Sequence, residues 1–172
     1  MESELEGLRR RCEGWLRDLD LPSPFDVDAF LKSLERRRGR PIRLYALPMS
    51  RDVSGLWARG PTDDYIFYEE RAAPVLQAHI KLHEACHIVC GHKPLVLSEA
   101  EESSLFFPDL LPQMVRRFLH RGSYSTVEER EAELLASLIL ERVGPPLVRE
   151  AKPLDDETAR VLAKHRAVFE RR

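Results

Sequence analysis

The segment His83-Glu84-Ala85-Cys86-His87 combines residue types and a spacing that suit metal chemistry. On a helix, two side chains four residues apart lie on one face, with their Cβ atoms about 6 Å apart. Two imidazoles placed in this way reach one tetrahedral zinc ion, which binds each nitrogen at about 2.0–2.1 Å. The intervening glutamate points to the adjacent side, where it can take a proton from a water molecule that zinc has acidified. The segment therefore predicts zinc bound by His83 and His87, with Glu84 as the general acid and base.

The surroundings of this segment favour a helix with a functional site over a chance coincidence of residues. Apolar residues precede, interrupt and follow it: Val75, Leu76, Ile80, Leu82, Ala85, Ile88 and Val89. Burying two imidazoles and a carboxylate among such residues costs free energy unless the polar groups have partners. Pro74 suits the first turn of this helix and Gly91 its end, so we predict a helix from 74 to about 90.

A catalytic zinc site needs a third protein ligand and one open position. The candidates are His79, Cys90, His92, His120 and a carboxylate further along the chain. His79 and Cys90 lie about one helical turn beyond the two histidines, out of reach of the same metal, so we interpret them as supporting or packing residues. Cys86 and Cys90 would also allow a cysteine-rich structural zinc site, but such a site leaves Glu84 without a role. Tyr124, His92 and His120 are candidate donors to a reacting oxygen.

The carboxylate candidates lie near the start of a helix that we predict from 127 to about 143. Glutamates are common at helix N-termini because they interact favourably with the helix dipole. Glu129 and Glu133, however, are four residues apart and share one face. One of them can bind the metal while the other accepts the free N–H of a ligand imidazole. Glu128 and Glu131 point to other faces, and we expect neither to bind the metal.

Hydrophobic periodicity predicts an α+β fold with a small three-stranded sheet packed with helices, one of which carries the site. Helices are expected at 4–19, 27 to about 39, 74–90, 114–119, 127–143 and 154–169, and strands at 42–47, 55–58 and 65–68. The short connections between the strands favour a meander. We interpret 1–24 as an N-terminal helix, 25–150 as the core and 151–172 as a charged C-terminal helix, all within one compact domain.

Composition narrows the function classes. With 172 residues, 43% hydrophobic and 33% charged, the chain fits a globular domain rather than a disordered one. A formal net charge of -2 argues against direct binding to nucleic acid or to an anionic membrane. No apolar run approaches the roughly 20 residues that span a bilayer, and the first residues do not form a secretory signal. We therefore expect a cytoplasmic protein whose cysteines stay reduced.

These motifs together resemble the ImmA/IrrE family of metallopeptidases, and its actinobacterial members in particular. That family has a short sheet, a helix with HExxH, and a later helix with ExxA followed by Asn, Asp or Glu. Here the corresponding segments are Tyr65-Ile66-Phe67-Tyr68, His83-Glu84-Ala85-Cys86-His87 and Glu129-Arg130-Glu131-Ala132-Glu133. The resemblance covers roughly residues 25–140. The resemblance implies that the HExxH helix is a zincin-like active-site helix. The chain departs from the family at Cys86, where glycine is more usual, and after Glu133, where Leu134-Leu135 replaces the usual phenylalanine.

The resemblance implies a role for each matching residue. His83, His87 and Glu129 match the metal ligands, Glu84 matches the general acid and base, and Glu133 matches the residue that orients a ligand histidine. It further implies a zinc-dependent peptidase that cleaves a helix-turn-helix transcriptional repressor in a regulatory or stress response, so that DNA is reached only through the substrate. The alternative is a non-catalytic zinc protein that binds and sequesters a regulator. The intact Glu84 favours the peptidase, since structural zinc is usually closed by four protein ligands.

Overall fold

The computed structural model describes residues 2–49, 53–107, 111–121 and 124–147. Within them the helices are α1 (Glu2–Arg17), α2 (Val27–Arg38), α3 (Pro74–Cys90), α4 (Glu99–Ser104), α5 (Leu111–Arg121) and α6 (Thr126–Val143). The strands are β1 (Ile42–Leu47), β2 (Gly55–Arg59), β3 (Asp64–Glu69) and β4 (Leu95–Val96). The α+β class is confirmed. The helix predicted at 154–169, and with it the 151–172 segment, lies outside the described residues.

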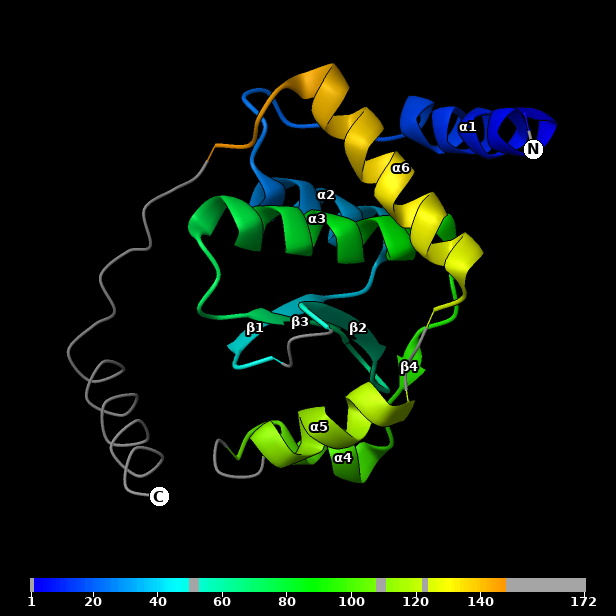
Figure 1. Cartoon of the computed structure of the whole chain (residues 1–172). Helices are drawn as coiled ribbons and strands as arrows, with labels where there is room; N and C mark the ends of the chain where they lie inside the picture. The colour runs from blue at the N-terminus through cyan, green and yellow to red at the C-terminus, as the bar shows by residue number, and fades with distance from the viewer. Residues whose placement is uncertain (1, 50–52, 108–110, 122–123, 148–172) are drawn as a thin grey trace.

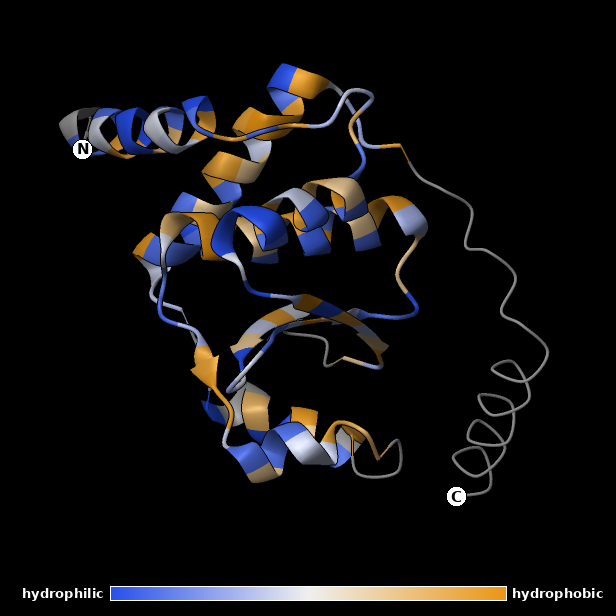
Figure 2. Cartoon of the chain, turned by 180° about the vertical axis from the view of Figure 1, so that it is seen from behind, coloured by the Kyte–Doolittle hydropathy of each residue, from blue (hydrophilic) through white to orange (hydrophobic). Residues whose placement is uncertain are grey.

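Helices cover both faces of the sheet (Figure 1). On one face α2, α3 and α6 form a hydrophobic core with the sheet, to which α1 contributes Cys12, and on the other face α4 and α5 enclose a second core. The alternation of β3 explains this division, because Ile66 points into the first core whereas Tyr65 and Phe67 point into the second. Figure 2 shows apolar residues along the strands, interrupted by polar ones.

The sheet corrects the expected three-stranded meander, because it has four strands in the order β1-β3-β2-β4. β3 lies between its two predecessors, parallel to β1 and antiparallel to β2. Burial provides the physical reason: the run from Asp64 to Phe67 is buried throughout, whereas β1 is exposed at Arg43 and Ala46. The strand with the longest buried run takes an inner place in the sheet, where both of its edges and both of its faces are covered. The two-residue strand β4 is too short to give a periodic signal.

Local capping explains where the helices begin and end. The Asp26 side chain accepts hydrogen bonds from the first turn of α2, and Gly39 ends that helix with a φ of 62°. α3 begins at Pro74 and ends at Gly91, whose φ is 72°. The sequence reading missed α4, which Ser98 starts with a capping box. Among the described helices, none has the length and apolarity needed to cross a bilayer.

Candidate metal centre

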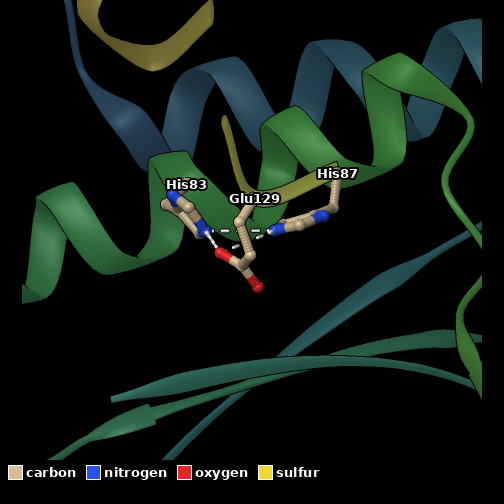
Figure 3. A group of neighbouring side chains, drawn as sticks. All are labelled: His83, His87 and Glu129. Carbon is tan, nitrogen blue, oxygen red and sulfur yellow. Dashed lines mark hydrogen bonds and ion pairs between the residues drawn. The ribbon is translucent and has the colours of Figure 1, made fainter. Parts of the chain in front are cut away.

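The side chains of His83, His87 and Glu129 converge on one point (Figure 3). The two histidines lie one turn apart on the side of α3 that faces the sheet, and their Nε2 atoms are 3.0 Å apart. Glu129 comes from the first turn of α6, with Oε2 3.2 Å from Nε2 of His83 and 3.9 Å from Nε2 of His87. Ligand atoms around a tetrahedral zinc are about 3.3 Å apart, given zinc–nitrogen bonds of about 2.0–2.1 Å. The three atoms therefore fit three corners of such a site.

The chemistry of these groups also fits a divalent cation. Burial and the neighbouring His83 and His92 lower the pKa of His87 to about 3, so its imidazole is neutral and keeps a lone pair. Glu129 supplies a negatively charged oxygen, and its side chain is 48% exposed, so the cluster is open to solvent on that side. Two imidazoles and one carboxylate are a donor set of catalytic zinc sites, and the accessible side corresponds to the open coordination position of such sites.

Helix α6 brings Glu129 to α3 because small residues line their contact. Ala132 and Ala136 are fully buried on α6, and Ala85 is fully buried on α3. The first turn of α6 is fixed by a capping box, in which Ser125 and Glu128 exchange hydrogen bonds. Glu128 is therefore engaged in the cap, which leaves the adjacent Glu129 as the carboxylate of this turn beside the histidines.

Glu133 contacts the other nitrogen of His83. Its Oε2 lies 3.3 Å from Nδ1 of His83 and 3.6 Å from Nε2 of His79. A carboxylate on the outer nitrogen of an imidazole fixes the ring and directs its other nitrogen to a metal. The structure thus places Glu133 beside the outer nitrogen of His83, and His79 one turn away from the converging atoms.

His92, a candidate third ligand from the sequence, lies behind His87 instead. Its Nδ1 is 2.8 Å from Nδ1 of His87, and its Nε2 is 2.9 Å from Oε2 of Glu131. The turn at Gly91 produces this contact, since the N–H groups of Gly91 and His92 fold back to carbonyls of Ile88 and His87. Sequence reasoning missed this role, although a histidine directly after a helix-ending glycine was a usable signal.

Glu84 is buried, with 4% of the residue exposed. Its Oε2 atom has no hydrogen-bond partner within the described residues. Burial and the Glu129 carboxylate raise the pKa of Glu84 to about 8, against a hydrogen bond from the backbone N–H of Trp57. Gly55 on β2 makes room for it, because a Cβ there would lie 2.7 Å from Oε1 of Glu84. An unpartnered carboxylate oxygen with a near-neutral pKa is suited to proton transfer.

Tyr124 forms a wall of the centre. Its ring stacks on the imidazole of His87, with centroids 3.6 Å apart and planes inclined by 17°. Its hydroxyl is buried without a hydrogen-bond partner in the described part of the chain. Burial, together with the charges of Glu84 and Glu129, raises the pKa of this hydroxyl, which therefore stays protonated and able to donate. The side chain of His120, the third candidate donor, is outside the described residues.

The cysteine-rich zinc site considered as an alternative is not seen among the described residues, because neither Cys86 nor Cys90 belongs to the converging group of potential ligands. Burial raises the pKa of the Cys86 thiol well above its ordinary value. Burial also raises the pKa of the Cys90 thiol. Within the described ranges, the group of potential ligand atoms that converges is His83, His87 and Glu129.

Comparisons of the chain with protein-family models, curated proteins and solved structures gave no match. The function of the centre is therefore inferred from its own residues.

Proposed function

We propose that this chain is a zinc-dependent metallopeptidase of the ImmA/IrrE type, with zinc held by His83, His87 and Glu129. The observation that carries the proposal is the convergence of these three ligands beside the buried Glu84, whose Oε2 has no hydrogen-bond partner within the described residues. A structural zinc site would be closed by a fourth protein ligand and would have no use for that carboxylate. Three ligands with an open side instead leave a coordination position for chemistry.

Zinc, when bound, supplies a Lewis acid that polarises a carbonyl and makes water more acidic. The unpartnered Oε2 of Glu84 would take a proton from the attacking water and pass it to the leaving amide nitrogen. The N–H of Trp57 holds the carboxylate in place, and burial keeps its pKa high enough for it to carry a proton near neutral pH. The Tyr124 hydroxyl is a candidate donor to the substrate carbonyl oxygen as negative charge develops there.

The substrate follows from the family resemblance rather than from the geometry of the centre. We propose a protein substrate, specifically a helix-turn-helix transcriptional repressor cleaved in a regulatory or stress response in the cytoplasm. The formal charge of -2 gives the chain no general attraction to nucleic acid, which agrees with action on the repressor and not on its DNA.

The decisive experiment combines metal analysis with cleavage. Purified wild-type chain should contain about one zinc ion, and His83→Ala and His87→Ala should each empty the site. On co-expression with the nearest encoded helix-turn-helix repressor, the wild type should produce a cut repressor. Glu84→Gln should keep the zinc and reduce cleavage by about 10²–10⁴-fold, because it removes the basic oxygen but preserves size. Unchanged zinc content in both histidine variants would overturn the metal assignment.

The same experiment separates the peptidase from a sequestering zinc protein. If zinc is present but no cut repressor appears with either version, and Glu84→Gln leaves the regulatory effect in cells unchanged, the chain acts by binding. The Oε2 atom of Glu84 favours the peptidase, since a binding protein has no need of a buried carboxylate oxygen that lacks a hydrogen-bond partner among the described residues.

A further inference from the structure

Three consecutive hydrogen bonds connect the imidazole of His87 to the N-terminal helix. Nδ1 of His87 meets Nδ1 of His92 at 2.8 Å, and Nε2 of His92 meets Oε2 of Glu131 at 2.9 Å. Arg11 on α1 then donates to Oε1 of Glu131 from Nη2 at 2.6 Å and from Nε at 2.9 Å. Cys12 is adjacent, with its thiol 3.6 Å from the backbone carbonyl of Glu131. The chain of contacts therefore spans α3, α6 and α1.

The part of this hydrogen-bonded network from His87 to Glu131 is enclosed, whereas the side chain of Arg11 is 52% exposed. The side chain of His87 is fully buried, and those of His92 and Glu131 are 6% and 11% exposed. Water therefore has little access to the bonds between them, and each buried polar group depends on its neighbour in the chain. The contact between His83 and Glu133 differs, because Glu133 is 56% exposed and can exchange its partner for water.

The chemistry of the four side chains determines which atom donates and which accepts in each hydrogen bond of this network. Arginine only donates, so Glu131 accepts from Arg11 and, as a carboxylate, also from His92. Nε2 of His92 therefore carries the hydrogen of that bond, and the tautomer with its hydrogen on Nε2 has a lone pair on Nδ1. That lone pair accepts the Nδ1 hydrogen of His87, so the Nε2 of His87 keeps its lone pair and points it at the converging ligand atoms.

We propose that His92 is a positioning residue for the metal centre, fixed by Glu131 and Arg11, and that α1 thereby supports metal binding. The proposal rests on the zinc site of the proposed function. His92 holds the ring of His87 in one tautomer and one orientation. Loss of such an outer hydrogen bond typically weakens metal binding by about 10–100-fold.

The test measures zinc affinity of the full chain by competition with a chromophoric chelator. His92→Leu removes the acceptor at similar size and should weaken zinc binding about 10–100-fold. His92→Gln offers an amide oxygen to the Nδ1 hydrogen of His87 and should restore most of the loss. Substitution of cobalt for zinc gives a second readout, since its visible spectrum should change in His92→Leu and return toward wild type in His92→Gln.

Two matched substitutions on α1 test the Arg11 end of the hydrogen-bonded network without changing buried residues. Arg11→Gln should weaken zinc binding several-fold, whereas Arg9→Gln should not, because among the described residues Arg9 pairs with Glu13 and lies outside this network. His92→Leu and Arg11→Gln affinities within twofold of wild type would overturn the inference, and so would a His92→Gln variant no better than His92→Leu. If instead wild type binds zinc no better than His83→Ala, the zinc site itself, and with it the proposed function, is wrong.

Discussion

At the scale of single residues, Glu84 depends on a glycine of the sheet. A Cβ at position 55 would lie 2.6 Å from Cγ2 of Ile80 and 2.7 Å from Oε1 of Glu84, closer than side chains approach one another. Both neighbours belong to α3, so an added methyl group would push the carboxylate away from its place. Gly55 is therefore required by space rather than by backbone conformation.

We expect Gly55→Ala to reduce cleavage of the proposed repressor substrate by about 10²-fold, because a displacement of about 1 Å in a catalytic group, the role proposed for Glu84, has an effect of that size. Zinc content should stay near wild type, since the ligands His83, His87 and Glu129 are untouched. Gly14→Ala is the control, because the nearest atom to its added Cβ would be 3.8 Å away. Full activity in Gly55→Ala would mean that the position of Glu84 is not critical.

Two adjacent glutamates of α6 have different environments and should behave differently. Glu129→Ala removes a proposed ligand and should abolish stoichiometric zinc binding. Glu128→Ala should keep the zinc but lower the free energy of unfolding by about 1 kcal/mol, because it breaks the capping box with Ser125. Metal analysis and urea unfolding of both variants check this, and zinc loss in Glu128→Ala alone would show that the wrong carboxylate was assigned.

At the scale of elements, Asp64 joins α2 to the sheet. It is fully buried at the start of β3 and accepts from Arg38 at 2.6 Å, from Arg40 at 2.9 Å and from Arg59 at 3.3 Å. Burial opposes ionisation of Asp64, but the hydrogen bonds and charges of Arg38 and Arg40 outweigh it and lower the pKa below its ordinary value. A carboxylate that is favoured in the folded state stabilises the fold when it is ionised.

The pH dependence of this contribution follows from the lowered pKa. It is fully present above the unfolded-state pKa of about 3.9 and is lost as the pH falls through the lower folded-state pKa. Asp64→Asn should therefore lower the free energy of unfolding by about 1.5–3 kcal/mol at pH 7, and the difference from wild type should shrink below about pH 4. Denaturant unfolding across this pH range measures it.

The control for this prediction is Asp63→Asn. Its partner Arg43 is 60% exposed, so the change should cost less than about 1 kcal/mol. A difference between Asp64→Asn and wild type that stays constant down to pH 2 would contradict the assignment of the effect to ionised Asp64.

The helices could be predicted from the sequence because their signals are local. Asp26, Gly39 and Gly91 cap α2 and α3 in the expected way, and these caps need no knowledge of the rest of the chain. The strand order could not be predicted, because the central place of β3 depends on burial of both its faces by helices far along the chain. α4 was not predicted, although the capping box of Ser98 and Glu101 is a local signal for its start.

The candidate site divides in the same way. Helical spacing was sufficient to place His83 and His87 on one face, and the resemblance singled out Glu129 as the third member of the group that the structure brings together. The contacts of His92, Glu131 and Arg11 were beyond the sequence reading. They arise where α1 packs against α6, which no local pattern specifies.

At the scale of the whole molecule, the proposed zinc would join α3 and α6, two helices that are separated in sequence by elements on the opposite side of the sheet. α3 and α6 lie on the same side of the sheet, whereas α4 and α5, which come between them in sequence, lie on the other side (Figure 1). Ligands from both helices mean that the complete site exists only when the layers are assembled. Zinc should therefore bind the folded chain in preference to the unfolded one and stabilise it.

We expect zinc at about 100 times its dissociation constant to add about 2.7 kcal/mol to the free energy of unfolding. For a chain of this length, each kcal/mol raises the melting temperature by about 2–4 °C, so the shift between chelator-treated and zinc-loaded protein should be about 5–10 °C. His83→Ala should melt at the same temperature with and without zinc, because it lacks a ligand. Glu84→Gln should keep the full shift, since Glu84 lies outside the ligand set. Thermal unfolding followed by circular dichroism gives all three values, and a wild-type chain that melts at one temperature regardless of zinc would show that α3 and α6 are not joined by the metal.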